Sequence, residues 1–175
     1  LFEISKELEK KAKAIKPKKV EKKETKIKLK EEKERVWYKK FRYAFTSTNK
    51  MVLLGKDAIT NEILLKKYAV DDDIIVFHSD FPGSPFAVVW PKQELREEEM
   101  EEVASLVASY TSKAWEAGFS ALDVFCVRRS QLSKKAPSGT FLSKGSFVVS
   151  GEKRFFKSCP LKILISFNES GEPLA

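Results

Sequence analysis

His78, the one histidine of the chain, has a carboxylate close by in the sequence. Asp80 follows it by two positions, and side chains two apart on a strand lie on the same face of a sheet. A nucleophile beside a histidine and a carboxylate would indicate a hydrolase. Cys126 is a poor nucleophile among its apolar strand neighbours, and no second histidine is present to complete a zinc site. Three roles for His78 stay open: a structural hydrogen bond, contact with a ligand, or acid–base catalysis.

A second group of polar residues lies where a helix is expected to begin, in the stretch GKDAITNEILLKKY that starts at Gly55. Asp57 suits the N-cap position of that helix. The cap does not explain Lys56 or Asn61. A helix N-terminus favours anions and a neighbouring lysine adds to that preference, so two readings stay open at this point: a well-capped helix only, or a cap that is also a binding site.

The loop SKKAPSGTFLSKGSF, residues 133–147, combines lysines and hydroxyls with turn-forming residues. Its lysines are Lys134, Lys135 and Lys144. Hydroxyls, exposed backbone amides and lysines are the groups that hold phosphates, although the order GxxxxGK[ST] of a P-loop is absent. The alternative is an ordinary solvated hairpin loop.

Phenylalanines and basic residues alternate toward the end of the globular part. The phenylalanines are Phe141, Phe155 and Phe156, and the basic residues are Lys144, Lys153, Arg154 and Lys157. This mixture suits contact with a nucleic-acid backbone together with stacking of bases. Because alternate positions of a strand must face inward, most of these phenylalanines are expected in the core.

Charge is distributed unevenly along the chain. The net charge is +8, and residues 1–40 contain 16 Lys/Arg against 8 Asp/Glu. Residues 71–102 carry a net charge of −8, and residues 128–162 carry +8. A basic arm and a basic lobe favour a polyanionic partner, most often nucleic acid. For the arm, the alternative is a solvated lysine-rich helix.

The periodicity of the chain predicts the elements that must position these residues. Apolar residues at spacings of three and four predict a helix over 1–16, which Pro17 interrupts. Its narrow apolar stripe needs a partner helix, so residues 1–34 are predicted to form a charged coiled-coil arm with a protein partner. The remaining predictions are hairpins over 41–54 and 147–155, strands at 74–77, 86–90 and 123–128, and helices over 58–68 and 96–117.

These elements lack a strict βαβ repeat, which predicts an α+β fold with a mainly antiparallel sheet and flanking helices, preceded by the helical arm. The expected domains are the arm at 1–34, a globular domain at 35–162 and a tail at 163–175. No apolar run approaches the roughly 20 residues that span a bilayer, so no membrane is expected. Two cysteines without a disulfide pattern indicate a cytoplasmic protein. The start, Leu1 onward, has no signal-peptide pattern and indicates a segment of a longer protein.

Five separated stretches occur in order and together resemble one family. They are WYKKF to KKY from Trp37, HSDFPGSP from His78, Ala114-Trp115, SKKAPSGTFL from Ser133, and GSFVVSGEKRFF from Gly145. The chain resembles the NFACT-R domain, the RNA-binding module of the NFACT ribosome quality-control family, which includes Rqc2 and bacterial fibronectin-binding protein homologues. The resemblance covers residues 35–160. The chain departs from the family pattern at Lys56, Pro82, Thr140 and Ser150, where arginine, histidine, glutamate and arginine are usual.

The resemblance implies RNA binding, with tRNA or rRNA as the ligand, on a large ribosomal subunit that carries a stalled nascent chain, and recruitment of tRNA. It implies no cofactor, no metal and no catalytic residue, so the chain is not expected to be an enzyme. The expected RNA-binding residues are Lys56, Asp57, Asn61, His78, Asp80, Gly83, Lys134, Lys135, Lys144, Lys153 and Arg154. Two alternatives stay open: an enzyme acting on RNA or an aminoacyl ester through His78 and Asp80, and a protein-interaction module acting through the coiled-coil arm.

Overall fold

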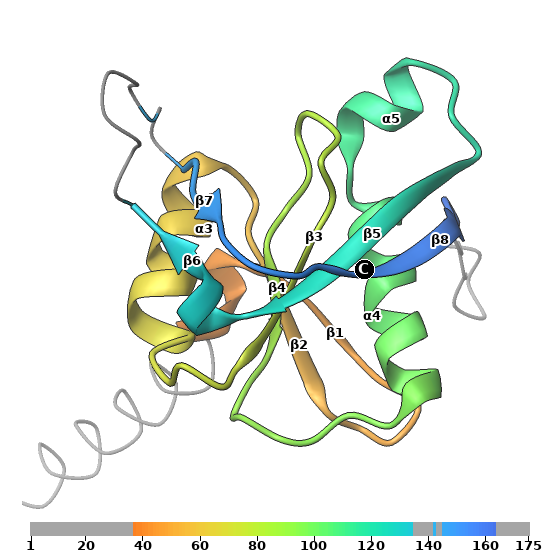
Figure 1. Ribbon diagram of the computed structural model, residues 1–175. Coiled ribbons are helices and arrows are strands. Elements are labelled where there is room, and N and C mark those ends of the chain that lie inside the picture. Colours follow the sequence, from red (N-terminus) through yellow and green to blue (C-terminus); the bar gives the residue numbers. More distant parts are fainter. Residues whose placement is uncertain (1–36, 135–141, 143–144, 164–175) are drawn as a thin grey trace, which may run out of the picture. The chain divides into compact units, whose positions relative to one another are not determined.

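The computed structural model describes residues 37–134, 142 and 145–163 (Figure 1). The predicted arm at 1–34, and residues 164–175 of the tail predicted at 163–175, lie outside these residues, and both segments stay predictions. The strands are β1 (Arg42–Phe45), β2 (Met51–Leu54), β3 (Ile75–His78), β4 (Ala87–Val89), β5 (Ala121–Arg128), β6 (Leu132–Ser133), β7 (Val148–Val149) and β8 (Arg154–Pro160). The helices are η1 (Trp37–Lys40), α3 (Ala58–Ile63), η2 (Leu64–Tyr68), α4 (Glu97–Ser109), α5 (Ser112–Glu116) and η3 (Arg129–Gln131). Within the described residues, no helix has the length and apolar character that crossing a membrane requires.

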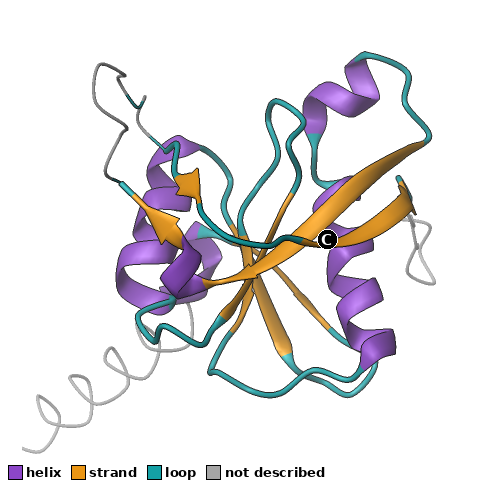
Figure 2. Ribbon diagram, in the orientation of Figure 1, coloured by secondary structure: helices purple, strands orange, loops and turns teal. Residues whose placement is uncertain are grey.

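Six strands form one sheet in the order β1-β2-β4-β3-β5-β8 (Figure 2). Each neighbouring pair of these strands is antiparallel. The short strands β6 and β7 pair with each other in a second, two-stranded sheet. The predicted α+β class with a mainly antiparallel sheet is therefore confirmed for the described part of the chain. In the larger sheet, β1 and β8 are the edge strands.

Helices lie on both faces of the larger sheet, with α4 on one side and α3 with η2 on the other (Figure 1). The strand residues in the core with α4 include Val52, Leu54, Phe77, Val124, Cys126 and Phe156. The alternate residues Leu53, Val76, Val88 and Phe125 are also buried, and the pleat turns them toward the other layer. There, Leu64 and Leu65 of η2 are fully buried. The central strands are thus covered on both faces, which explains their continuous apolar runs.

The helix predicted over 96–117 is wrong in its extent, because it is divided into α4 and α5. Thr111 lies between the two helices, and its Oγ1 donates to the carbonyl of Val107 at 2.8 Å. Such a bond from Thr to a carbonyl four residues earlier disturbs a helix. Trp115 then donates its indole N–H to the carbonyl of Ser109 at 2.8 Å, which satisfies an acceptor at the end of α4.

The hairpin predicted over 147–155 is also wrong, because its two halves belong to different sheets. Val148 in β7 pairs with Ser133 in β6, whereas Phe155 in β8 pairs with Phe125 in β5. Gly151, at φ +76°, lies between β7 and β8. By joining β5, the strand β8 places Phe156 in the core beneath α4, a burial that a local hairpin would not provide.

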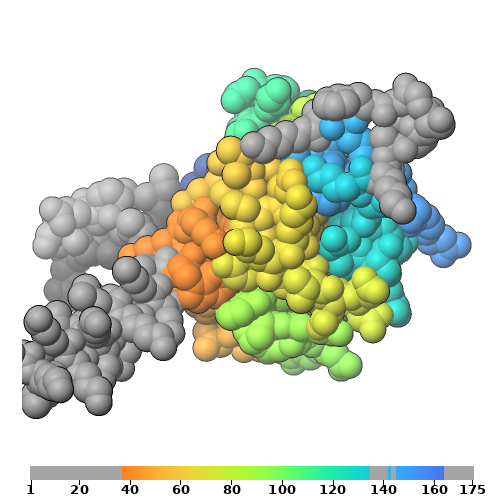
Figure 3. Space-filling view, turned by 90° about the vertical axis from the view of Figure 1, so that its left-hand side faces the viewer, coloured from red at the N-terminus to blue at the C-terminus, as the bar shows by residue number. Residues whose placement is uncertain are grey.

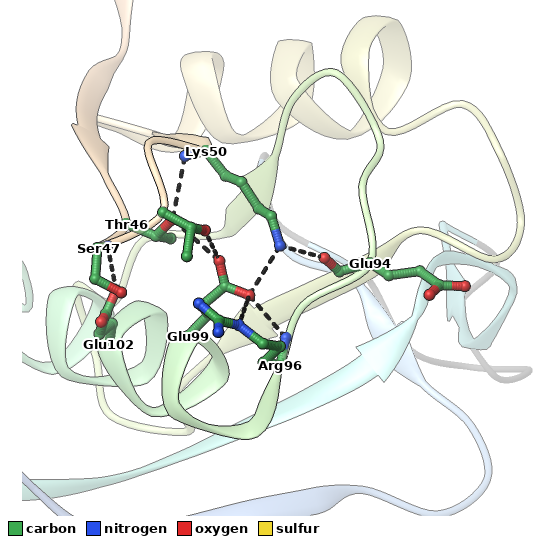
Figure 4. Close-up of polar contacts among 8 residues, drawn as sticks. Thr46, Ser47, Lys50, Glu94, Arg96, Glu99 and Glu102 are labelled. Carbon is green, nitrogen blue, oxygen red and sulfur yellow. Dashed lines mark hydrogen bonds and ion pairs between the residues drawn. The ribbon is translucent and has the colours of Figure 1, made fainter.

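A buried carboxylate joins the turn between β1 and β2 to the first turn of α4 (Figure 4). The side chain of Glu99 is fully buried, and its Oε2 accepts from Lys50 Nζ at 2.8 Å and from the backbone N–H of Arg96 at 2.8 Å. Thr48 donates to Oε1. These hydrogen bonds, that from Lys50 first, lower the pKa of Glu99 to about 2, so the carboxylate is ionised at neutral pH. The charge is compensated where it is buried, as a buried ion requires.

Candidate nucleic-acid interface

A cleft of about 500 Å³ opens between the start of α3, the loop from β3 to β4, and the segment that leads into β7. Six of the predicted RNA-binding residues line it: Lys56, Asp57, Asn61, His78, Asp80 and Gly83. Figure 3 shows the α3–η2 layer, in yellow, beside β6 and β7 in cyan and blue. Three segments that are distant in the sequence therefore share one concave site.

The prediction that Asp57 caps α3 is confirmed. Its Oδ1 accepts from the backbone N–H of Thr60 at 2.8 Å, and the hydroxyl of Thr60 accepts in return from the backbone N–H of Asp57 at 2.9 Å. The hydrogen bond from the Thr60 backbone is the main reason that the pKa of Asp57 is lowered. Thr60 was not singled out from the sequence, although a polar residue three positions after an N-cap is the signal of a capping box.

Lys56 is the exposed cation at this corner of the cleft. Its backbone N–H donates to the hydroxyl of Thr60 at 2.8 Å, so the capping box also fixes its backbone. Its Nζ donates to the carbonyl of Lys39 at 2.9 Å. Among the described residues, this neutral carbonyl is the one acceptor of the ammonium group, so they do not compensate its charge and they leave two of its three donors available.

Asn61 links two of the elements that line the cleft. Its Oδ1 accepts from the backbone N–H of Phe86 at 3.0 Å, which ties α3 to the residue before β4. A Cβ added at Gly55 would lie 1.9 Å from the same Oδ1, so only glycine fits there. Since the oxygen must face the N–H of Phe86, the amide NH₂ of Asn61 is the part that stays available. The helix cap gave no reason for a polar residue at position 61. The hydrogen bond to Phe86 provides that reason.

His78 is held in one tautomer by its neighbours. Its Nδ1 lies 3.0 Å from the carbonyl of Pro85, which can only accept, so Nδ1 carries the proton. The ring stacks on Phe86 with centroids 4.1 Å apart and planes 18° apart. Burial is the main cause that lowers the pKa of His78, so the ring is neutral at neutral pH. Nε2 is then an acceptor, and no described residue donates to it.

Asp80 lines the same cleft as His78 but does not bond to it. Both carboxylate oxygens of Asp80 accept from Lys153 Nζ, at 3.0 and 2.9 Å. The orienting partner of His78 is the carbonyl of Pro85. Sequence reasoning placed the two side chains in one cleft, which the lining residues confirm. The hydrogen-bonded pair that acid–base catalysis would require is not assembled.

The loop between β3 and β4 is shaped by hydrogen bonds between residues close together in the sequence. Ser84 donates its backbone N–H to the carbonyl of Phe81 at 3.2 Å, and its hydroxyl accepts from the backbone N–H of Ser79 at 3.0 Å. Gly83 has φ +81°, a conformation that L side chains rarely adopt. Its place at the rim of the cleft therefore follows from the turn.

Gly145 closes the cleft from the side of β7 and was missed by sequence reasoning. Its φ is +83°, and a Cβ added there would lie 2.7 Å from both Cα and Cβ of Ala58. The segment leading to β7 can approach the start of α3 only because this residue is glycine. A glycine within a lysine- and serine-rich loop was the available signal, but its partner could not be identified from the sequence.

The other predicted basic residues divide between the cleft side and the opposite face of the sheet. Lys134 pairs with Glu62 of α3 at 3.0 Å and lies over the ring of Phe147, 4.7 Å from its centroid. Lys153 reaches the cleft through Asp80. Lys135 and Lys144 lie outside the described residues.

Arg154 is not brought to the cleft. In β8 it pairs with Cys126, a residue of the core beneath α4, so its side chain lies on the α4 face of the sheet. There it forms an ion pair with Glu97 and lies 5.3 Å from the ring centroid of Phe156. The expectation that it acts beside Lys153, which directly precedes β8, overlooked that consecutive residues of an extended chain face opposite ways.

Among the described residues, no group of three or more His, Cys, Asp or Glu side chains is arranged to hold a metal ion. The site instead combines the exposed Lys56, and Lys153 paired with Asp80, with a neutral histidine acceptor, amide donors and a tight turn. Those groups can bind an anionic ligand that also carries hydroxyl or heterocyclic hydrogen-bonding groups.

The family model for the NFACT protein RNA binding domain matches residues 40–151. An archaeal Rqc2 homologue, aRqcH of Methanocaldococcus jannaschii, is 44% identical over 144 residues, which are 82% of this chain and 21% of that protein. The ribosome quality control complex subunit NEMF homologue of Drosophila melanogaster is 34% identical over 74% of this chain and 13% of that protein. Human NEMF is 33% identical over 75% of this chain and 12% of that protein.

A solved structure also resembles the described part of the chain. The C-terminal part of the fibronectin/fibrinogen-binding protein from Streptococcus suis aligns with a TM-score of 0.55, over 69% of this chain and 45% of that one. At 19% identity this likeness shows the fold alone. The chain spans about a fifth or less of the length of the curated relatives it matches.

Proposed function

The chain belongs to the family of NFACT protein RNA binding domains, and from that premise we propose that it binds RNA in the cleft between α3, the β3–β4 loop and the segment before β7. The observation that carries the proposal is the meeting of six expected residues in that one cleft. They come from two segments of the chain, and the first of these places the exposed Lys56 at the rim of the cleft. The cap of α3 does not require a lysine there, whereas a site for a polyanion is favoured by one.

Each group of the cleft has a part in this proposal. Lys56 and Lys153 contact phosphates, which supply most of the affinity. The available NH₂ of Asn61 donates to a phosphate or a base edge. His78 Nε2, kept unprotonated by the Pro85 contact, accepts a hydrogen bond, and the ribose 2′-hydroxyl is a donor that RNA has and DNA lacks. The cleft then selects RNA by chemistry rather than by charge alone.

The whole protein's role is proposed from its relatives. Two of those named above are subunits of a ribosome quality control complex and a third is an Rqc2 homologue. We infer that the RNA is tRNA or rRNA on the large ribosomal subunit with a stalled nascent chain, that the protein recruits tRNA, and that it works in the cytoplasm. The coiled-coil arm with its protein partner stays a prediction.

The hydrogen bonds within the cleft do not favour the enzymatic alternative, although His78 and Asp80 both line the cleft. That alternative needs Asp80 to orient His78, but Asp80 is held by Lys153 and His78 by Pro85. The proposed role of the chain is therefore to bind RNA without changing it.

The salt dependence of RNA affinity tests the proposal. We expect log K for tRNA to fall linearly with log salt, and Lys56→Ala and Lys153→Ala each to lower the slope by roughly 0.7–0.9, the value for one phosphate contact. Lys92→Ala is the matched control, since Lys92 is an exposed lysine in an ion pair with Asp71 and does not line the cleft. Affinity that is independent of salt, or a slope that changes as much in the control, would contradict the proposal.

A further inference from the structure

The cleft continues across the sheet as a row of aromatic rings that ends at the edge strand β8. The row is Phe147, Phe86, His78, Phe125 and Phe155, with successive ring centroids 5.6, 4.1, 5.9 and 5.9 Å apart. Strand register explains its second half, because His78 pairs with Phe125 and Phe125 with Phe155. Residues paired across antiparallel strands lie on the same face of a sheet.

Lysines lie along this row. Lys153 Nζ is 4.1 Å from the ring centroid of Phe125, and Lys157 Nζ is 4.7 Å from that of Phe155. Lys153 is paired with Asp80 at 2.9 Å and Lys157 with Asp123 at 2.6 Å. Ion pairs with exposed partners contribute little to stability. A phosphate can therefore replace either carboxylate at small cost.

Phe155 is the ring of this row that the fold needs least. It is 45% exposed, whereas Phe125 is 1% exposed and the next residue, Phe156, is 9% exposed. It forms one wall of a shallow hollow of about 370 Å³ beside the cleft, which Asp80 and Phe81 also line. Asp123 borders the same hollow. Aromatic walls with carboxylate acceptors suit a flat heterocycle that carries an amino group, as cytosine, adenine and guanine do.

We propose that Phe155 stacks an unpaired base of the RNA that occupies the cleft, so that the ligand of this site is single-stranded RNA and not duplex. This inference rests on the proposed function. Bases within a duplex are stacked on each other and cannot present a face to a ring on a strand edge, whereas the splayed bases of loops and ends can. Lys153, directly before β8, and Lys157, within it, lie two residues to either side of Phe155 and hold the neighbouring phosphates.

The test uses the whole chain with Phe155→Ala, Phe155→Leu and Phe155→Trp. Phe45→Ala is the matched control, because Phe45 is 51% exposed on the other edge strand, β1. Each protein is titrated with a labelled oligocytidylate, which stays unpaired, and with a blunt-ended RNA duplex of two fully complementary strands. Phe155→Leu keeps an apolar contact with Phe125, so a loss that both Ala and Leu share is not due to unfolding.

Phe155→Ala and Phe155→Leu are expected to weaken oligocytidylate binding roughly 5- to 100-fold, the range for losing one base–aromatic stack. Phe155→Trp and Phe45→Ala are expected to leave it unchanged, and duplex binding is expected to be unchanged in every variant. Unchanged oligocytidylate binding in Phe155→Ala, or equal losses for both RNAs, would overturn the inference while the proposed function stands. If the unaltered chain binds neither RNA, the proposed function fails and the inference fails with it.

Discussion

Single side chains of the cleft hold the fold with one atom and leave another for a ligand. Asn61 accepts from the backbone N–H of Phe86 through Oδ1, and no described residue accepts from its NH₂ group. His78 donates through Nδ1 to the carbonyl of Pro85 and leaves Nε2. The cap explains Asp57, and the contact with Phe86 explains why residue 61 is polar. The contact with Phe86 needs only an acceptor oxygen, which a carboxylate at position 61 would also provide. The need for an amide at this position can therefore be tested.

Asn61→Asp keeps the acceptor for the N–H of Phe86 and replaces the NH₂ group with a second carboxylate oxygen. We expect its melting temperature to stay near that of the unaltered chain and its RNA affinity to fall, because a donor is lost and a negative charge is gained. Asn61→Ala, the comparison variant, leaves the N–H of Phe86 without its partner and should lower the free energy of unfolding by about 1–3 kcal/mol. An Asp variant that binds RNA as the unaltered chain does would show that Asn61 is structural only.

Among the elements, the turn between β1 and β2 depends on a charge in α4. Lys50 reaches from the turn to the buried carboxylate of Glu99 and also donates to the carbonyl of Glu94 at 2.6 Å (Figure 4). Ser47 adds a backbone N–H that donates to Glu102 at 2.8 Å. The hairpin end and the start of α4 are thus fixed to each other, and β2 in turn pairs with β4, which follows the cleft loop.

This arrangement predicts a pH-dependent stability. The folded-state pKa of Glu99, about 2, lies below its ordinary value of 4.5. Its contribution is therefore fully present above about pH 4.5 and is lost as the pH falls toward about 2. We expect Glu99→Gln to lower the melting temperature at neutral pH, and the difference from the unaltered chain to shrink over that acidic window. Glu98→Gln, on the exposed face of the same turn, should change the melting temperature little; a Glu99→Gln deficit that persists at low pH would contradict the account.

Elements whose signals are local could be predicted from the sequence. The hairpin from Phe41 to Leu54 follows from its alternation and turn residues, and the structure pairs β1 with β2 in antiparallel fashion. The helix after Asp57 follows from its cap and its apolar face. The split of the long helix at Thr111 was missed, because a β-branched residue in an apolar stripe gives no sign that its hydroxyl turns back to Val107.

Features that depend on strand register could not be predicted. Whether β8 joins β7 or β5 is decided by how well Phe156 fills the core beneath α4, which no local pattern reports. The pairing of β8 with β5 also places Lys153 at the cleft and Arg154 on the opposite face of the sheet. Likewise, the spacing of His78 and Asp80 placed both in one cleft but could not supply Pro85 and Lys153 as their partners.

At the scale of the whole described domain, charge is divided unequally between the two faces of the sheet, although Asp80 of the acidic stretch lies at the cleft and Arg154 of the basic stretch lies on the α4 face. The strongly acidic stretch, residues 71–102, includes the first turn and a half of α4 with Glu97, Glu98, Glu101 and Glu102. The basic stretch, residues 128–162, supplies β6, β7 and β8, and its Lys134 and Lys153 lie on the cleft side. A polyanion is repelled by the α4 face and attracted to the face that carries the cleft. The position of the site and the field of the molecule therefore favour the same direction of approach.

Photocrosslinking tests the central claim, RNA binding in the cleft, most directly. The chain is bound to tRNA or to rRNA fragments that contain 4-thiouridine, irradiated, and digested, and the crosslinked peptides are identified by mass spectrometry. The account predicts crosslinks in Lys56–Asn61, in His78–Phe86 and in residues 145–149, with none in Glu97–Ser109. Crosslinks that gather on α4, with the three cleft segments unmarked, would contradict it.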